Sequence, residues 1–198
     1  MSPRPYEMGR RRESVDDTRA RVLAAARDLL VAKGAVAVDA IARRADVSRA
    51  TVYYQFGTKI GLLEALCDDL AERGRMERLA ETFGLPDARA SLRLFVEVIA
   101  DFWAVDRDCT RRLRGLAALD PDVGQVIAAR DDRRRAGATV LATRLDAGPD
   151  FGPILYTLTS FEVFDSLAAD RPISEAAAGI QGLLDAALTT PPPRQPAG

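Results

Sequence analysis

The fold of this chain is decided by residues 38–63, VDAIARRADVSRATVYYQFGTKIGLL. Apolar residues three to four positions apart predict a short helix over residues 39–45. A tight turn follows, and its last residue, Ser48, is of a type that caps helices, so a second helix is expected over residues 49–55. Another helix begins near Thr58. The stretch therefore predicts two short helices joined by a tight turn and followed by a third.

The rest of the chain continues this helical pattern. Apolar residues recur at intervals of three and four, and no Asn-Gly or Asp-Gly pair separates alternating runs. We therefore expect an all-α fold of about nine helices. The helix before the quoted stretch begins near Thr18 and stops at Gly34. The helix from Thr58 has a possible continuation, with a bend at Gly74, to residue 82. Later helices are expected over residues 87–105, 108–119, 121–146, 153–169 and 174–188.

These elements predict two domains and two flexible ends. Residues 15–60 form a three-helix helix-turn-helix domain, and residues 61–188 form a helical domain. Residues 1–14 combine Pro, Gly and Arg without periodicity, which is typical of a flexible basic arm. Residues 189–198 are proline-rich and are predicted to be a disordered tail.

Composition excludes several classes of function. The 198 residues include two cysteines and no histidine, so we predict no metal site, no cofactor and no catalytic triad, and we expect both cysteines to be buried. The longest uncharged run covers residues 151–161, whereas a membrane span needs roughly 20 apolar residues. No apolar secretion signal follows the N-terminal arginines. We therefore expect a cytoplasmic protein without a membrane partner.

The charge distribution indicates a nucleic-acid partner for the front of the chain. Residues 1–59 hold twelve basic and seven acidic side chains, whereas residues 60–198 hold 16 basic and 22 acidic ones. A basic front portion suits the neutralisation of DNA phosphates, because each cation bound there releases a counterion. A wholly architectural DNA-binding protein would need a more basic chain. Random surface charge is the alternative interpretation.

An α-helix fits the major groove of double-stranded DNA, and the residues at its start face the base edges. Arg49 could reach the acceptors of a guanine, with a solvated arginine or a phosphate contact as the alternatives. Thr51 offers a hydroxyl and a methyl group, and Ala50 offers a methyl group for a thymine. Lys59 begins a helix whose dipole already favours a phosphate.

The segment resembles the helix-turn-helix of the TetR family of bacterial transcriptional regulators over roughly residues 15–66. The shared elements are Ala40-Ile41-Ala42, Val47-Ser48, the run from Thr51 to Phe56, and Lys59 with Leu62-Leu63. In this comparison Tyr53 is similar to a tyrosine that bonds a phosphate. The candidate DNA contacts are Arg43, Arg44, Ser48, Arg49, Ala50, Thr51, Tyr53, Tyr54 and Lys59. Tyr54 and Phe56, however, fit packing against the first helix better.

The chain departs from the family pattern at two places. Where the family usually has a capping Ser or Thr that bonds a phosphate, this chain has Ala37 and Val38. Arg43 and Arg44 are therefore expected to carry more of the phosphate binding. The turn residue, often glycine in the family, is Asp46, which tolerates a left-handed backbone better than most residues do.

The resemblance implies that the rear domain binds a small effector and forms a homodimer. Aromatic and polar side chains at helical spacing could line an apolar cavity there, although ordinary core packing explains each of them equally well. The candidate ligand residues are Phe95, Ile99, Phe102, Trp103, Tyr156 and Ser160. The last two helices are expected to pair with a second copy as a four-helix bundle through Phe161, Phe164, Ile180 and Leu184. The arginines at positions 133–135 are expected to form a solvated face paired with Asp131 and Asp132, with contact of one arginine to an acidic effector as the alternative.

The sequence thus predicts a homodimeric repressor that a small, largely apolar effector releases from a palindromic operator. A regulator that needs no ligand, or one that activates transcription, is the alternative within this class. The alternative from another class is an enzyme that uses Glu97 and Asp101, four residues apart on one helix, as general acid and base.

Overall fold

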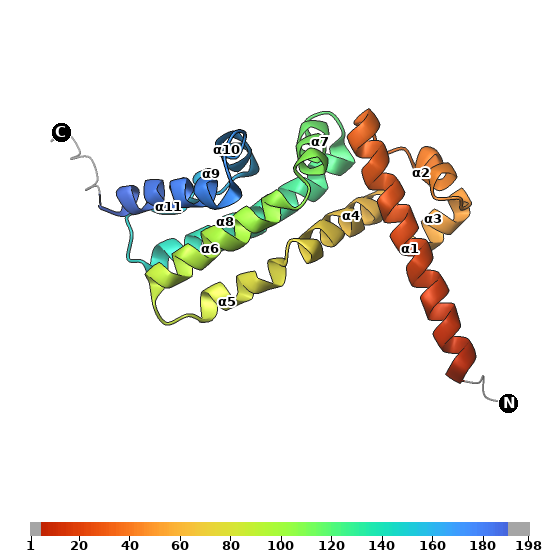
Figure 1. The fold of residues 1–198 in the computed structure, drawn as a ribbon, viewed down its shortest axis with the longest axis horizontal. Coiled ribbons are helices and arrows are strands. Elements are labelled where there is room, and N and C mark those ends of the chain that lie inside the picture. The colour runs from red at the N-terminus through yellow and green to blue at the C-terminus, as the bar shows by residue number, and fades with distance from the viewer. Residues whose placement is uncertain (1–4, 190–198) are drawn as a thin grey trace. The chain divides into compact units, whose positions relative to one another are not determined.

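The computed structural model describes the backbone of residues 5–189 and the side chains of residues 15–189. Helices form its regular structure, and no strand occurs among the described residues, which confirms the all-α prediction (Figure 1). The chain divides into two compact units. The first combines the described residues up to 69 with residues 111–127, and the second combines residues 70–110 with the described residues from 128 onward. The sequence predicted a single boundary after residue 60.

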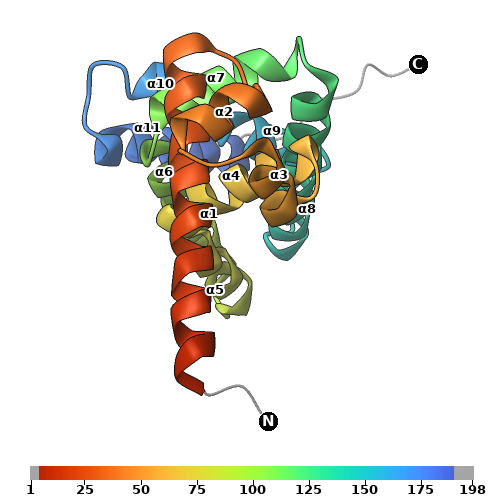
Figure 2. The ribbon, with the colours of Figure 1, turned by 90° about the vertical axis from the view of Figure 1, so that its right-hand side faces the viewer.

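The first unit contains the predicted pair of short helices and the long helix before them. Its elements are α1 (Pro5–Lys33), α2 (Val38–Arg44), α3 (Arg49–Phe56), most of α4 (Lys59–Arg73), the end of α7 (Arg107–Ala117) and the start of α8 (Pro121–Arg144). In Figure 2, α2 and α3 lie alongside α1. Their shared core includes Val22, Leu30, Ile41 and Val52, none of which is more than 1% exposed.

Helix α1 begins at Pro5, well before the expected start at Thr18. Proline suits the first turn of a helix because its missing N–H has no partner there in any case. Arginine is a good helix former, so residues 10–12 continue the helix. Residues 5–14, expected to form part of a flexible arm, are thus helical. Residues 1–4 of that expected arm, and residues 190–198 of the expected tail, lie outside the described residues.

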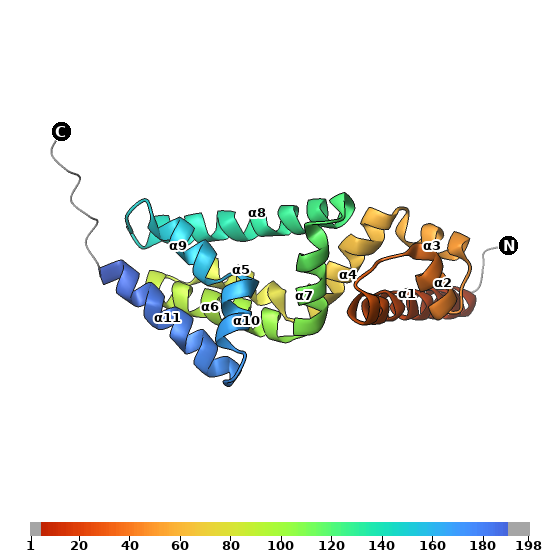
Figure 3. The ribbon, with the colours of Figure 1, turned by 90° about the horizontal axis from the view of Figure 1, so that it is seen from above.

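The second unit is built around α6. Its elements are the end of α4, a 3-10 turn η1 (Met76–Arg78), α5 (Leu79–Gly84), α6 (Ala88–Ala104), the start of α7, the rest of α8, α9 (Phe151–Leu158), α10 (Phe161–Leu167) and α11 (Ile173–Thr189). Helix α11 packs on α6, α9 and α10 (Figure 3). Asp87 caps α6 by accepting a hydrogen bond from the backbone N–H of Arg89 at 2.9 Å.

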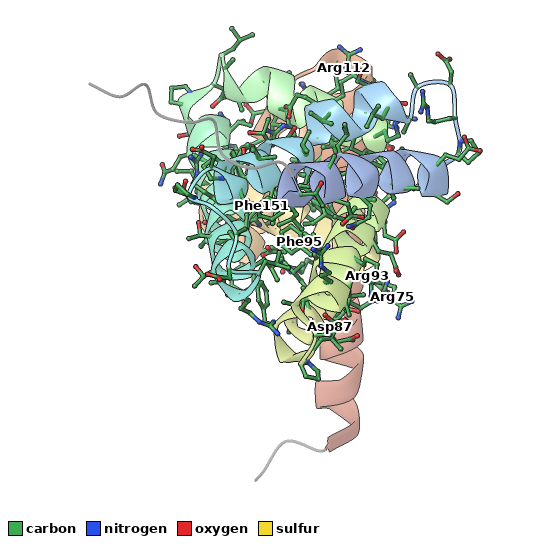
Figure 4. The ribbon with its side chains drawn as sticks, turned by 90° about the vertical axis from the view of Figure 1, so that its left-hand side faces the viewer. Arg75, Asp87, Arg93, Phe95, Arg112 and Phe151 are labelled. Carbon is green, nitrogen blue, oxygen red and sulfur yellow. The ribbon has the colours of Figure 1, made fainter. Side chains whose placement is uncertain are left out.

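Helix α6 is central, as the width of its apolar stripe predicts. Phe95 is completely buried and lies among the packed helices in Figure 4, whereas Asp87 and Arg93 lie at the surface. Trp103 is also buried, and its indole N–H donates to the carbonyl oxygen of Thr159 at 3.0 Å. Because that bond satisfies the only polar atom of the ring, Trp103 can serve as core.

Two expected helices are interrupted, the first of them at Gly74, where the sequence predicted a bend. Helix α4 ends at Arg73, because Gly74 and Arg75 leave the helix and Arg75 adopts a left-handed φ of 54°. Gly74 is needed there, since a Cβ atom on it would lie 2.8 Å from the ring of Phe102. The expected helix over residues 153–169 is divided into α9 and α10, because Ser160 is extended and caps a new helix through the N–H of Val163.

One arginine of the expected solvated cluster is part of the interior. Arg134 is only 7% exposed, its guanidinium donates to Thr159 Oγ1 at 3.2 Å, and it lies 4.0 Å from the centre of the Tyr156 ring. The expectation that this arginine is solvated is therefore wrong. Cys67 and Cys109 are both buried, as expected. Within the described part of the chain, no helix is long and apolar enough to cross a membrane.

Candidate nucleic-acid interface

The turn between α2 and α3 has the predicted geometry. Asp46 adopts a left-handed φ of 54°, which confirms that aspartate takes the place of glycine in this turn. Ser48 caps α3, with its Oγ accepting a hydrogen bond from the N–H of Thr51 at 2.9 Å and lying 2.8 Å from the Thr51 hydroxyl. Ala37 precedes α2 without any side-chain cap, as its residue type predicts. The start of α3 therefore has a side-chain cap, whereas the start of α2 is held by backbone hydrogen bonds to the carbonyl oxygen of Ala37 alone.

Helix α3 has one buried and one exposed face. Val52 and Phe56, four residues apart, are buried, and the guanidinium of Arg19 lies 4.7 Å from the centre of the Phe56 ring. Ala50 is exposed, and Tyr54 is 85% exposed. Packing of Tyr54 against the first helix is therefore a wrong prediction, whereas packing of Phe56 is confirmed. Helical periodicity is the signal that separates them, because Tyr54 lies two positions from both buried residues.

Arg49 is exposed but already has partners. Its Nη1 atom lies 3.0 and 3.2 Å from the two carboxylate oxygens of Asp39, and its Nη2 atom lies 3.4 Å from the Tyr53 hydroxyl. The hydrogen bond to Tyr53 and then the charge of Asp39 raise the pKa of Arg49. The guanidinium thus bridges Asp39 of α2 and Tyr53 of α3.

The two arginines at the end of α2 are both exposed. Arg44 donates to Asp28 of α1 at 2.7 Å, and this pair links the two helices at the surface. Arg21 donates to the carbonyl oxygen of Ala45, beside the end of α2. Arg43 and Arg44 therefore bring two positive charges to the same end of α2, where phosphate contacts were predicted.

Lys59 is in a setting that the sequence did not predict. Its Nζ atom lies 2.6 Å from Oδ2 of Asp120 and 3.2 Å from Oδ2 of Asp122. The hydrogen bond to Asp120 raises the pKa of Lys59 and lowers the pKa of Asp120. The lysine predicted to hold a phosphate therefore faces two carboxylates from the start of α8. No periodicity or motif connects residues that are 61 positions apart.

None of the six predicted ligand residues lines a pocket that lies beside α6 in the described part of the chain. Phe95, Ile99 and Trp103 are buried in the core, and Phe102, Tyr156 and Ser160 are half-buried. The rings of Phe102 and Trp103 are in contact, with their centres 4.6 Å apart. A pocket of about 450 Å³ is lined instead by Arg73, Gly74, Arg75, Asp101, Ala104, Val105 and Ile173.

The four predicted dimer residues are turned toward the interior of their own chain. Phe161, Phe164, Ile180 and Leu184 are at most 3% exposed and belong to one cluster with the buried residues of α6. Their side chains have almost no accessible surface with which to contact a second copy of the chain. The exposed residues of α11 include the small or apolar residues Ala178, Gly179, Gly182, Leu183 and Ala186, together with the polar or charged residues Ser174, Glu175, Asp185 and Thr189.

The two carboxylates of the enzyme alternative are ion-paired. Nη2 of Arg78 lies 2.7 Å from Glu97, and Nη1 lies 3.2 Å from Asp101. Both carboxylates share one cation at the surface of α6, where Glu97 is 57% and Asp101 51% exposed. The arrangement is that of an ordinary surface ion-pair network.

Known proteins resemble the chain at two levels. Residues 22–66 match the family model described as bacterial regulatory proteins, tetR family. This range covers the C-terminal part of α1, all of α2 and α3, and the first half of α4. No curated protein matches the chain.

Solved structures share the fold over most of the chain. A TetR-like transcriptional regulator from Rhodococcus sp. RHA1 is 27% identical, with a TM-score of 0.63 over 84% of this chain and 93% of that one. A second regulator, from Rhodococcus sp. Rha1, is 18% identical, with a TM-score of 0.63 over 88% of this chain and 99% of that one. The TetR-like regulator LfrR from Mycobacterium smegmatis was solved in complex with proflavine. It is 20% identical, with a TM-score of 0.52 over 88% of this chain and 98% of that one.

Proposed function

Because the chain belongs to the tetR family of bacterial regulatory proteins and is a DNA-binding transcriptional regulator, we propose that it acts as a homodimeric repressor released from its operator by a small molecule. One helix-turn-helix contacts only a few base pairs, so two copies on successive major grooves are needed for useful specificity. Half-sites about 34–36 Å apart suit a two-fold symmetric pair of α3 helices. The operator is therefore a palindrome.

The exposed face of α3 is the observation that carries this proposal. Tyr54 extends an aromatic ring and a hydroxyl into solvent, although buried residues flank it on the same helix. Arg49, Ala50 and Thr51 occupy the first turn, where a recognition helix meets base edges. Base contacts by Arg49, Ala50 and Thr51 and phosphate contacts by Tyr53 and Tyr54 use these exposed and half-exposed groups. Ser48, Arg43 and Arg44 contribute further contacts to the DNA backbone.

Substitution of Arg49 tests the base contact. We expect Arg49→Ala to weaken binding to the operator about tenfold and to relax the preference at one base position, because the bidentate contact to a guanine is lost. Fluorescence anisotropy with an operator selected from a random library, and with each single-base variant of it, measures both effects.

The matched control is Arg93→Ala, which removes an arginine of equal exposure from the second unit. This control is expected to bind every duplex like the wild-type protein. An Arg49→Ala protein that keeps full affinity and the same base preference would refute the assignment of Arg49.

The dimer in this proposal pairs the exposed side of α11 with the same helix of a second copy. Leu183 is 51% exposed, and no atom lies within 4 Å of a Cβ atom placed on Gly179 or Gly182. Small residues allow a partner helix to come close, and a self-complementary surface suits a two-fold interface. The four buried residues predicted from the sequence then support this surface from below.

The effector in this proposal binds the pocket beside α6. Apolar contacts come from Ala104, Val105 and Ile173. Two arginines, Arg73 and Arg75, outnumber the single carboxylate of the lining, that of Asp101, so the net charge of the lining is positive. Such a lining favours a small compound with an apolar body and an acidic group. LfrR, which shares the fold, holds the small molecule proflavine. Release follows if the ligand binds more tightly to a conformer that cannot span two half-sites.

Fluorescence of the single tryptophan tests the effector site. Gly74 lines the pocket and approaches the ring of Phe102, which in turn contacts Trp103. An apolar carboxylate bound there is expected to change the emission of Trp103 and to weaken operator binding. By linkage, the operator must weaken binding of the carboxylate by the same factor. Fluorescence and anisotropy titrations measure the two factors independently.

Arg75→Gly is the matched variant, because glycine accepts the left-handed backbone that arginine adopts at this position. It is expected to lower affinity for the carboxylate about tenfold and to leave operator binding of the ligand-free protein unchanged. If no apolar carboxylate both changes the emission and releases DNA, the regulator acts without such a ligand.

A further inference from the structure

Lys59 begins α4, at the end of the helix-turn-helix, and is enclosed by two acidic residues. Its ammonium group contacts Asp120, just before α8, at 2.6 Å and Asp122, in the first turn of α8, at 3.2 Å. All three residues belong to the first unit. Figure 3 shows the start of α8 beside α4. The lysine that would meet a DNA phosphate is thus already bound.

The Lys59–Asp120 contact is better fixed than an ordinary surface ion pair. The side chains of Lys59 and Asp120 are 29% and 24% exposed, against about 60% for both members of the Arg49–Asp39 pair. Asp120 is also held by its own helix, because its Oδ1 atom accepts hydrogen bonds from the N–H groups of Asp122 and Val123. Its other oxygen, Oδ2, accepts the hydrogen bond from Lys59. The backbone hydrogen bonds to Oδ1 therefore hold the carboxylate in position independently of the lysine.

The charge around Lys59 opposes a phosphate. One ammonium group faces two carboxylates, so the local sum is one negative charge. A phosphate that approached Lys59 would come close to both carboxylates and would be repelled by them. The positive end of the α4 dipole, which alone would attract the phosphate, is offset by the same two acids.

We propose that Asp120 and Asp122 bind the ammonium group of Lys59 in place of a DNA phosphate. These two residues thereby lower both the affinity of the start of α4 for the DNA backbone and the salt dependence of that binding. The proposal rests on the DNA binding described above and adds two determinants from α8. The pair lowers binding to all sequences equally, because phosphates carry no sequence information. Selectivity for the operator then depends more on the contacts of α3.

Charge-neutral variants of the full chain test the proposal. Asparagine in place of Asp120 keeps the oxygen that caps α8, and asparagine is itself a favoured cap. We expect Asp120→Asn/Asp122→Asn to bind a 30-base-pair duplex of random sequence about tenfold more tightly at low salt. The plot of log affinity against log salt should steepen by about one unit, because one more phosphate is neutralised. Fluorescence anisotropy over a series of sodium chloride concentrations measures both quantities.

The matched control is Asp132→Asn/Asp170→Asn, which removes two charges from exposed positions of the second unit. It separates the local effect from the change in net charge and is expected to raise affinity less than twofold. The single variant Asp122→Asn leaves the capping residue unchanged and should give part of the gain. Circular dichroism is expected to show wild-type helicity for each variant.

Lys59→Ala, made in the wild-type chain and in the Asp120→Asn/Asp122→Asn chain, decides whether the two acids keep the lysine from DNA or position it for DNA. We expect this substitution to change affinity less than threefold in the wild-type chain and to abolish the gain in the Asp120→Asn/Asp122→Asn chain. The opposite pattern, in which the two asparagines weaken binding and Lys59→Ala alone costs about tenfold, would overturn the proposal. Equal affinity of the asparagine and control variants would overturn it as well. A wild-type chain that binds no duplex at all would instead refute the proposed function.

Discussion

Gly61→Ala is expected to lower the free energy of unfolding by about 3 kcal/mol or more and to abolish DNA binding. A Cβ atom on Gly61 would lie 2.1 Å from the carbonyl oxygen of Phe56, and 3.3 Å from the carbon of the same group. These are backbone atoms at the end of α3, so no side-chain rotation can relieve the clash. The junction between α3 and α4 must move, and α3 moves with it. Urea denaturation and duplex binding measure the two losses.

Gly115→Ala in α7 is the control for this prediction. No atom lies within 4 Å of a Cβ atom placed on Gly115, and the residue is in the interior of a helix. Alanine there should raise the free energy of unfolding by up to about 1 kcal/mol, because glycine loses more conformational freedom on folding. Unfolding of Gly61→Ala at the same urea concentration as the wild type, together with equal DNA binding, would contradict the close approach of Gly61 to the backbone of Phe56.

Leu184→Asp is expected to prevent folding of the second unit. Leu184 is completely buried in the cluster that joins α11 to α6. Removal of a buried leucine side chain alone typically costs about 2–5 kcal/mol, and aspartate adds the desolvation of a charge without a partner. The sum is comparable to the whole stability of a domain of this size, about 5–15 kcal/mol. Circular dichroism should therefore show a loss of helicity at 25 °C.

Leu183→Asp, one residue earlier, is the control and at the same time tests the dimer. Leu183 is half-exposed, so the aspartate remains solvated and the helicity should be that of the wild type. On the proposed interface, however, two aspartates would face each other across the two-fold axis. Sedimentation equilibrium should then find monomers where the wild-type chain forms dimers. A folded Leu184→Asp monomer, or a Leu183→Asp dimer as stable as the wild type, would contradict this arrangement of α11.

Local features of the structure were readable from the sequence because they depend on neighbouring residues. Ser48 and Asp87 cap helices through backbone groups two or three positions away. Asp46 and Gly34 adopt the left-handed conformations that their residue types favour. The spacing of apolar residues in α6 likewise predicted its burial on most sides. These interactions span less than two helical turns, so their partners are visible in a short stretch of sequence.

Features that depend on which helices meet were decided only by the tertiary structure. Lys59 contacts one carboxylate just before α8 and one in the first turn of α8, and Arg134 is buried because it reaches Thr159 and Tyr156. Leu184 belongs to the interior of its own chain, since α11 turns that face toward α6. An apolar face on a helix predicts that the face is buried against another element. The sequence does not say whether that element is a neighbouring helix of the same chain or a helix of a second copy. The sequence by itself therefore determined the all-helical fold, the cap of α3 and the DNA-reading motif, whereas the packing of the helices decided which charges pair and which faces stay exposed.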